Sequence, residues 1–296
     1  MKKIFTGIMP AIVTPLKADN RTVNVDVMGQ LVERHLADGA DGFYLLGGTG
    51  EGLVVDREQR EILCEATVKQ VAGRKPIINH IAAMNLEETV ELAKHAEKAG
   101  CDAISSVPPL FFFHDAEDLY NYYKKLAESV TIPVIMYYHP SAGAHMSAEL
   151  VARICEIDNM TGVKWSVNNY YEMMRLKDMT QGDVNIINGP DEMLLMGLSA
   201  GADAGIGSTY NLMLPQYKAI YKAFKAGDID TARRLQMQVN RVVKVVVSNE
   251  TIPAVKYGVN MMGYDVGVAT FPMRQIPAGS CPALEAELKE AGWPFR

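Results

Sequence analysis

Short apolar runs and longer amphipathic runs alternate along the first three quarters of the chain. In the longer runs the apolar residues recur at helical spacing, whereas the short runs have the length and composition of strands. The predicted strands are the runs GIMPAIVTP (7–15), GFYLLG (42–47), PIINHI (76–81), AISSVP (103–108), PVIMYY (133–138), GVKWS (162–166), NIING (185–189) and AGIGS (204–208). The helices expected between them include residues 25–39, 56–73, 85–100 and 115–130.

Strict alternation of strand and helix predicts a parallel sheet, and eight such units predict an α/β fold, the closed (β/α)8 TIM barrel. A weak internal repeat supports this fold, because the helix-to-strand junctions recur as ADGADG (37–42), KAGCDA (98–103) and SAGADA (199–204). In each junction we expect a glycine to end the helix in a left-handed cap and the aspartate to turn the chain into the next strand.

The pattern changes after about residue 226. Residues 227–249 have the pattern of one long helix, residues 251–263 and 281–292 of two shorter ones, and no further strand is evident. We therefore expect a barrel domain over residues 1–226 and a C-terminal helical extension over residues 227–296. This helical appendage would pack on the barrel or on a neighbouring subunit.

Composition and charge narrow the class of protein. The chain has 296 residues, of which 48% are hydrophobic and 22% charged, as in ordinary globular proteins. Its net charge is -6 and it has no basic cluster, so we expect no nucleic acid as a partner. No apolar run reaches membrane-spanning length, so we expect no membrane association. Pro10 and Pro15 interrupt the apolar N-terminus, which argues against a signal peptide.

The four cysteines, Cys64, Cys101, Cys155 and Cys281, are far apart and form no zinc-like spacing and no CxxC pair. Each lies among apolar residues, where a small buried hydrophobic residue is the default interpretation. The six histidines form no metal-ligand motif. These features predict a soluble, reduced, cytoplasmic protein without a metal site.

One residue conflicts with the strand pattern, because Lys164 interrupts the apolar run GVKWS. Active sites of (β/α)8 barrels lie where the strands end. A lysine there can bury its stem and extend its amine to solvent. Alternatively, in a partly dry site its pKa falls, and the neutral amine attacks a ketone to form an imine that lets carbon–carbon bonds break or form. Tyr137, one strand away, is either a core tyrosine or the acid/base that this chemistry needs.

Polar residues at other strand ends complete the candidate site. The glycines of GGTGE (47–51) let backbone amides converge, and Thr49 adds a hydroxyl, an arrangement that suits a substrate carboxylate beside a helix N-terminus. Asp191 and Glu192, in NGPDE, either cap the next helix or accept hydrogen bonds from a substrate rich in hydroxyls. Ser208, in GIGST, follows the eighth strand.

These motifs, in this order and spacing, resemble the pyruvate-dependent class I aldolase family that contains N-acetylneuraminate lyase and dihydrodipicolinate synthase. The resemblance runs from the TP of AIVTP, through GGTGE, Y-x-x-P and GVK, to the tail segment VKYGVNMMGYDVG. It implies that Lys164 forms the imine and that Tyr137 moves the proton. It also implies that Thr49 and its loop, which includes Gly48, hold the pyruvate carboxylate.

Within the family, the segments NGPDE and GADAGIGSTYNLM are closest to the N-acetylneuraminate lyases. The residues that match positions holding the sugar chain there are Gly189, Asp191, Glu192, Gly207 and Ser208, and Ser166 matches a Thr/Ser two residues after the lysine. The arginine with which the synthases hold a second carboxylate is absent from PSAGAHM, and this segment after Pro140 is one residue short. Gly48 stands where the family usually has Ser or Thr, and Phe111 where many members supply a tyrosine to a neighbouring subunit.

The resemblance implies a Schiff-base lyase that cleaves N-acetylneuraminate, a sialic acid, to N-acetylmannosamine and pyruvate without a metal or organic cofactor. It also implies a cytoplasmic homotetramer whose partners are small-molecule 2-keto acids. The alternatives are an aldolase or dehydratase for another 2-keto-3-deoxy sugar acid, or dihydrodipicolinate synthase. A protein of another class, a catalytically silent sugar-acid sensor on the same barrel, would not need both Lys164 and Tyr137.

Overall fold

The computed structural model describes residues 5–277 and 282–294. The strands are β1 Gly7–Pro10, β2 Phe43–Leu45, β3 Ile77–His80, β4 Ala103–Ser106, β5 Val134–Tyr138, β6 Met160–Trp165, β7 Asn185–Asn188 and β8 Ala204–Gly207. The helices between and after them are α1 Val25–Ala37, α2 Arg57–Val71, α3 Leu86–Ala99, α4 Ala116–Ala127, α5 Ala148–Ile154, α6 Tyr170–Met179, α7 Leu194–Ser199 and α8 Tyr210–Lys225. Two short 3-10 helices, η1 Pro140–Ala142 and η2 Asp191–Met193, follow β5 and β7.

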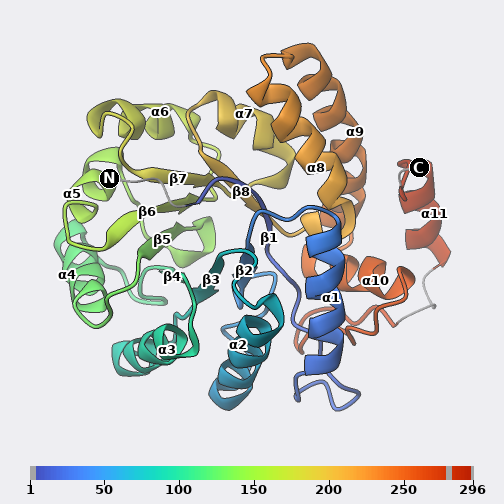
Figure 1. Cartoon of the computed structure of the whole chain (residues 1–296), viewed down its shortest axis with the longest axis horizontal. Helices are drawn as coiled ribbons and strands as arrows, with labels where there is room; N and C mark the ends of the chain where they lie inside the picture. The colour runs from blue at the N-terminus through green and yellow to red at the C-terminus, as the bar shows by residue number, and fades with distance from the viewer. Residues whose placement is uncertain (1–4, 278–281, 295–296) are drawn as a thin grey trace.

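The strands form one closed barrel. Their order is β1-β8-β7-β6-β5-β4-β3-β2, and an isolated parallel bridge between Ala11 and Tyr44 joins the two ends of the sheet. Across this junction the Ile12 N–H donates to the Tyr44 carbonyl at 3.0 Å. Figure 1 shows the helices arranged around the strands. The (β/α)8 prediction is confirmed, and all eight predicted strands and the four named helices are observed.

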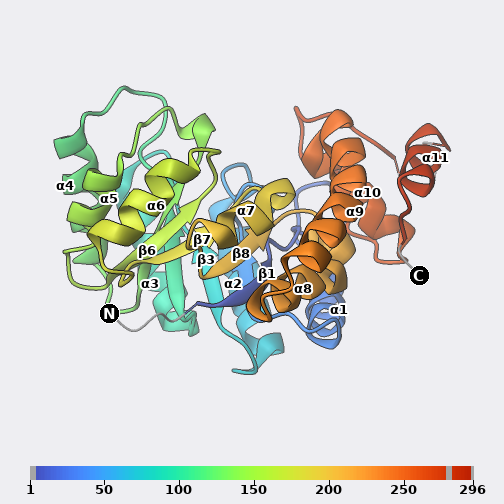
Figure 2. The same cartoon turned by 90° about the horizontal axis from the view of Figure 1, so that it is seen from above.

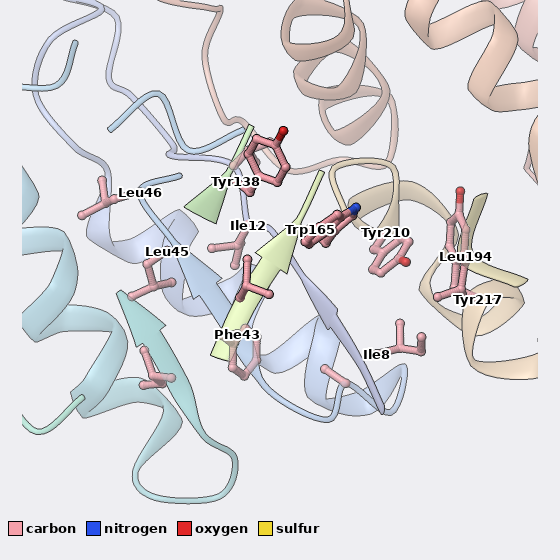
Figure 3. Close-up of a cluster of buried hydrophobic side chains, with 14 of the residues drawn as sticks. Ile8, Ile12, Phe43, Leu45, Leu46, Tyr138, Trp165, Leu194, Tyr210 and Tyr217 are labelled. Atoms are coloured by element: carbon pink, nitrogen blue, oxygen red, sulfur yellow. The ribbon is translucent and has the colours of Figure 1, made fainter. Parts of the chain in front are cut away.

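Burial on both faces of the sheet explains why the strands are continuous apolar runs. Successive strand residues point to opposite faces, so one set of side chains fills the barrel and the other packs outward against the helices. The interior cluster includes Met9, Tyr44, Ile135, Ile187 and Ile206. Figure 3 shows part of the larger outer cluster, which includes Ile8, Phe43, Leu45, Tyr138 and Trp165.

The internal repeat is a structural device, as the sequence predicts. The glycine that ends each helix has a positive φ, which is 86° at Gly39, 100° at Gly100 and 105° at Gly201. Each aspartate carboxylate accepts a hydrogen bond from a backbone N–H of the preceding strand, Asp41 from Ile8 (2.8 Å), Asp102 from Ile77 (2.8 Å) and Asp203 from Ile186 (3.0 Å). These aspartates therefore tie neighbouring strands together at the N-terminal end of the barrel, away from the candidate site.

Three further helices follow the barrel, α9 Ile229–Ser248, α10 Thr251–Met261 and α11 Pro282–Glu290. Helix α9 packs on α8, and α10 and α11 pack on α9. In Figures 1 and 2 these helices gather on one side of the barrel, opposite α4 and α5. The helix predicted from residue 281 is confirmed from Pro282 onward, because Cys281 lies outside the described residues. The proposed boundary at residue 226 falls between α8 and α9, and its interpretation as a domain boundary stays a prediction.

Cys64, Cys101 and Cys155 are free and buried, as the sequence predicts. Over residues 5–277 and 282–294, no helix has both the length and the apolar character that a membrane crossing requires.

Candidate active site

A cavity of about 580 Å³ opens at the C-terminal ends of the strands. All ten residues that the sequence singles out line it, namely Gly48, Thr49, Tyr137, Lys164, Ser166, Gly189, Asp191, Glu192, Gly207 and Ser208. They come from the ends of β2, β5, β6, β7 and β8, so segments far apart in the sequence meet at one rim. This convergence agrees with the rule that barrels carry their chemistry at the C-terminal face.

Lys164 lies on β6 and is 5% exposed. Its Nζ donates to Ser166 Oγ at 3.2 Å and lies 3.8 Å from the centre of the Tyr137 ring and 5.4 Å from that of Tyr44. These contacts are with neutral groups, and no carboxylate of the described chain is recorded in an ion pair with this amine. Its low exposure places the amine within the wall of the cavity rather than on the outer surface of the protein.

Tyr137 and Tyr138 occupy opposite faces of β5. Tyr137 pairs in register with Lys164 and belongs to the interior of the barrel. Its ring lies 6.0 Å from Tyr44, 5.8 Å from His80 and 5.5 Å from His139, measured between ring centres. Tyr138 belongs to the outer cluster, where its ring packs edge-on against Trp165 at 5.2 Å. Strand alternation therefore places Tyr137, and not Tyr138, beside the amine.

The turn after β2 forms part of the cavity wall. Gly48 and Thr49 line the cavity, and within the described chain no hydrogen bond from their backbone N–H groups to another protein atom is recorded. A Cβ built on Gly48 would meet nothing nearer than Tyr137 Oη at 3.8 Å, so the space beside that hydroxyl is open. The expected helix N-terminus is not beside this turn, because α2 begins only at Arg57. The helix N-terminus expected beside this turn is therefore wrong, whereas an anion site at the backbone amides of the turn stays a prediction.

Asp191 is held by the turn that follows β8. Its Oδ2 accepts hydrogen bonds from the Thr209 N–H at 2.7 Å, from Thr209 Oγ1 at 2.6 Å and from Ser208 Oγ at 3.2 Å. Burial raises the pKa of Asp191 to about 6, and these hydrogen bonds oppose the shift. Asp191 does not cap its own helix, where no side-chain cap is formed, and it instead fixes the position of Ser208.

Two glycines allow the close packing at this rim. A Cβ on Gly189 would lie 1.9 Å from Ser166 Oγ, and one on Gly207 would lie 2.0 Å from Asp191 Oδ1. Any side chain at either position would displace a polar group of the cavity wall. Gly189 and Gly207 are therefore part of the site because they leave room for these two neighbours.

His139 lines the cavity and was not singled out from the sequence. The Ser141 N–H donates to its Nδ1 at 3.2 Å, so the neutral ring carries its proton on Nε2. Burial is the main cause, and the nearby Lys164 the second cause, that lowers the pKa of His139 to about 4. The ring is therefore neutral at neutral pH. Ser141 and Asn168 line the same wall. The rule that loops after strands carry function would have found all three, since they follow β5 and β6.

Helix α9 supports the acidic rim through two polar residues that sequence reasoning missed. Gln236 Nε2 donates to the Asp191 carbonyl at 3.1 Å, and Asn240 Nδ2 donates to the Glu192 carbonyl at 3.1 Å. Gln236 also accepts from the Leu195 N–H at 3.0 Å. Their signal in the sequence is a pair of amides four residues apart on an otherwise apolar helix face.

Helices α9 and α10 also close one side of the cavity. The residues they contribute to its lining are Val243, Val247, Thr251 and Ile252. The C-terminal helices thus form part of the candidate site as well as packing on the barrel. Among the described residues, no three His, Cys, Asp or Glu side chains gather so that they could hold a metal ion.

Comparisons with known proteins find relatives along nearly the whole chain. The model of the Dihydrodipicolinate synthetase family matches residues 4–291. The N-acetylneuraminate lyase of Citrobacter koseri is 29% identical over 289 residues, which cover 97% of each chain. The solved N-acetylneuraminate lyase of Proteus mirabilis is 29% identical, covers 97% of this chain and 99% of its own, and has a TM-score of 0.92. The dihydrodipicolinate synthase of Aquifex aeolicus is 26% identical, covers 97% and 96%, and has a TM-score of 0.90.

The raised pKa of Asp191 predicts a pH dependence of stability. The folded chain binds this proton more tightly than the unfolded chain, whose aspartate has a pKa of 3.8, so the stability from protonation is lost as the pH rises from about 4 to 6. In Asp191→Asn this dependence disappears. The free energy of unfolding of the wild type relative to Asp191→Asn should therefore fall by about 2–3 kcal/mol between pH 4 and pH 7.

Urea unfolding at several pH values measures this difference. Asp230→Asn, an exposed aspartate in the first turn of α9, is the matched control for the loss of one carboxylate. Equal pH slopes for the wild type and Asp191→Asn would contradict the burial argument.

Proposed function

This chain belongs to the dihydrodipicolinate synthetase family and is a carbon–carbon lyase of the class I pyruvate aldolase type, and we propose that it cleaves N-acetylneuraminate reversibly to N-acetylmannosamine and pyruvate. The observation that carries the proposal is the buried Lys164 amine, paired in register with Tyr137 at the rim of the barrel. The lyase names of the relatives support the choice of sugar acid.

The first step forms a covalent intermediate on Lys164. Its neutral Nζ attacks C2 of the open-chain 2-keto acid, and water leaves to give an imine. The carboxylate of the substrate accepts hydrogen bonds from the amides of Gly48 and Thr49 and from the Thr49 hydroxyl. Once protonated, the imine nitrogen withdraws electrons from C3, so this chemistry needs no electron sink other than the lysine itself.

The second step breaks the C3–C4 bond. Tyr137 gives its hydroxyl proton to the water that leaves in the first step. As the phenolate it then accepts the proton of the C4 hydroxyl, and the electron pair of the C3–C4 bond moves to C3 to give an enamine while the aldehyde sugar leaves. Tyr137 passes this proton to C3 of the enamine and is protonated again by the water that attacks the imine. Water then hydrolyses the imine, which releases pyruvate and restores the Lys164 amine.

The sugar half lies against the ends of β6, β7 and β8. We expect the side chains of Glu192 and Ser208 to contact its hydroxyls. Because the Ser208 hydroxyl donates its proton to Asp191, its oxygen is oriented to accept a hydrogen bond from the substrate. On the β5 side, the Nε2–H of His139 offers a donor. A wall with acceptors on one side and donors on the other suits a polyhydroxylated chain, because each buried polar group then finds a partner.

The finer specificity has two alternatives within the family. A lyase or dehydratase for another 2-keto-3-deoxy sugar acid uses the same lysine, and the open space at Gly48 and the imidazole of His139 suit a different substituent. The synthase activity has support in the name of the Aquifex aeolicus relative. The segment PSAGAHM, without an arginine, favours the sugar acid over the second carboxylate of that reaction.

We also propose that the protein is a cytoplasmic homotetramer. Three consecutive phenylalanines after β4 are largely exposed, Phe111 by 87%, Phe112 by 72% and Phe113 by 91%. Such a cluster is typical of a protein–protein contact, because free monomers rarely leave contiguous large apolar side chains in water. A second copy of this chain is the partner that fits.

A substrate panel tests the proposed specificity. Pyruvate release should be fastest from N-acetylneuraminate and slower from 2-keto-3-deoxy sugar acids that lack the acetamido group. The third reaction, condensation of pyruvate with aspartate semialdehyde, should be the slowest of all. A lactate dehydrogenase-coupled assay measures the first two. A preference for an unacetylated sugar acid would replace the proposed substrate but leave the aldolase chemistry in place.

The two adjacent tyrosines provide a matched pair of variants. Tyr137→Phe should lower kcat for cleavage by about 10²–10⁴-fold, the usual contribution of a general acid/base, while borohydride still traps pyruvate on the enzyme. Tyr138→Phe removes the same hydroxyl on the outer face and should leave kcat within a few-fold of the wild type. Greater damage from Tyr138→Phe would contradict the assignment of the proton carrier.

The assembly is tested by sedimentation velocity. Replacing Phe111, Phe112 and Phe113 with serine should shift the protein from tetramers toward dimers or monomers at micromolar concentration, because it removes the apolar contact. As a control, serine at Phe271, an exposed phenylalanine in the C-terminal segment, should leave the assembly unchanged. A wild-type protein that sediments as a monomer would overturn the proposal.

A further inference from the structure

A fully buried ion pair joins the turn after β2 to the C-terminal helices. Lys256, on α10, places its Nζ 2.6 Å from Glu51 Oε1, and the two side chains are 1% and 0% exposed. Glu51 is the last residue of GGTGE, whereas Lys256 lies in the tail segment VKYGVNMMGYDVG. The pair is the most deeply buried contact between opposite charges recorded for the described chain.

Each of the two side chains also forms a hydrogen bond with the backbone of the segment that follows α10. Lys256 Nζ donates to the Val268 carbonyl at 2.9 Å, and Glu51 Oε2 accepts from the Thr270 N–H at 2.6 Å. Burial lowers the pKa of Lys256, and Glu51 opposes this shift. Since burying two charges is costly, two apolar residues would hold the same elements together at least as well. The ion pair therefore indicates that these elements must be oriented relative to one another and not only held together.

Glu51 also closes the turn that carries Gly48 and Thr49. Its backbone has a φ of +56°, in the left-handed region, and its N–H donates to the Gly48 carbonyl at 3.0 Å. Inside the turn, the Gly50 carbonyl accepts from Thr14 Oγ1 at 2.6 Å. With its carboxylate fixed by Lys256 and its N–H fixed by Gly48, Glu51 has little freedom to rotate. The backbone of Gly48 and Thr49, which line the cavity, is thereby held in one conformation.

We propose that Glu51 and Lys256 are positioning residues, which aim the amides of Gly48 and Thr49 at the carboxylate of the 2-keto acid. This inference rests on the proposed function, and it deepens it by assigning a role in pyruvate binding to the C-terminal helices. Helix α10 already lines the cavity with Thr251 and Ile252. The ion pair adds a mechanical link from that helix to the opposite wall, so the substrate's carboxylate end is organised by both parts of the chain.

The test is the pyruvate dependence of borohydride trapping in the double variant Glu51→Gln with Lys256→Met. This variant removes both charges together, so no unpaired charge is buried, and the glutamine keeps an acceptor for the Thr270 N–H. The pyruvate concentration for half-maximal trapping should rise by about tenfold or more, because small misplacements of binding groups are costly, while the amount trapped at saturation stays near the wild-type amount.

A second ion pair at the other end of β2 supplies the control. Lys218 Nζ lies 2.5 Å from Asp41 Oδ2, just before the strand that Glu51 follows. The double variant Asp41→Asn with Lys218→Met should change the melting temperature but leave half-maximal trapping at the wild-type pyruvate concentration. If the Glu51/Lys256 double variant does not fold, Glu51→Gln alone, which is nearly isosteric, is measured in the same way.

The outcomes separate the possible roles. An unchanged pyruvate concentration for half-maximal trapping, with only a lower melting temperature as in the control, would overturn the positioning role and leave a structural pair. In the single variant Lys256→Arg, which keeps the charge, half-maximal trapping at the wild-type pyruvate concentration would further support the positioning role. Absence of trapping in the wild-type protein would instead overturn the proposed function itself.

Discussion

The site depends on one constraint, the removal of the Lys164 amine from water. The amine lies inside a closed parallel barrel, against the face of Tyr137 and beside Ser166, without a carboxylate at ion-pair distance among the described residues. Burial of a charged side chain without a counter-charge is costly, so a lysine at this position is an exception to the apolar pattern of the barrel. The same placement sets the amine beside Tyr137, the proposed acid/base, at the rim of the cavity.

The rest of the site is organised around that amine in two halves. In the proposed reaction, the turn after β2 binds the acid end of the substrate, and the carboxylates and hydroxyl at the ends of β7 and β8 bind the sugar end. Each half is supported by the C-terminal helices. Lys256 holds the turn through Glu51, and Gln236 of α9 holds the backbone at Asp191. The C-terminal helices therefore constrain the turn after β2 and the backbone at Asp191 more tightly than the barrel alone would.

Much of the fold and the candidate site could be predicted from the sequence, because the relevant signals are local. Parallel strands buried on both faces leave short apolar runs, and a lysine within such a run is conspicuous. Strand alternation decides between Tyr137 and Tyr138 once the register is known, and the register came only from the structure. The assignments of catalytic and binding roles remain proposals.

Other features could not be read from the sequence, because they depend on contacts between distant segments. Nothing local in GGTGE indicates that Glu51 pairs with a lysine of α10, or that α2 begins only at Arg57. The direction of the Asp191 carboxylate, toward Thr209 and not toward its own helix, follows from the packing of β7 against β8. The proton position on His139 depends on one N–H of the following turn.

The most direct test of the central claim is to locate the covalent adduct. The protein is reduced with borohydride in the presence of pyruvate, digested and examined by mass spectrometry. We expect a reduced pyruvate adduct on the peptide that contains Lys164 and none on the peptide that contains Lys256, the other deeply buried lysine among the described residues. An adduct on Lys256 or on a surface lysine, with Lys164 unmodified, would contradict it.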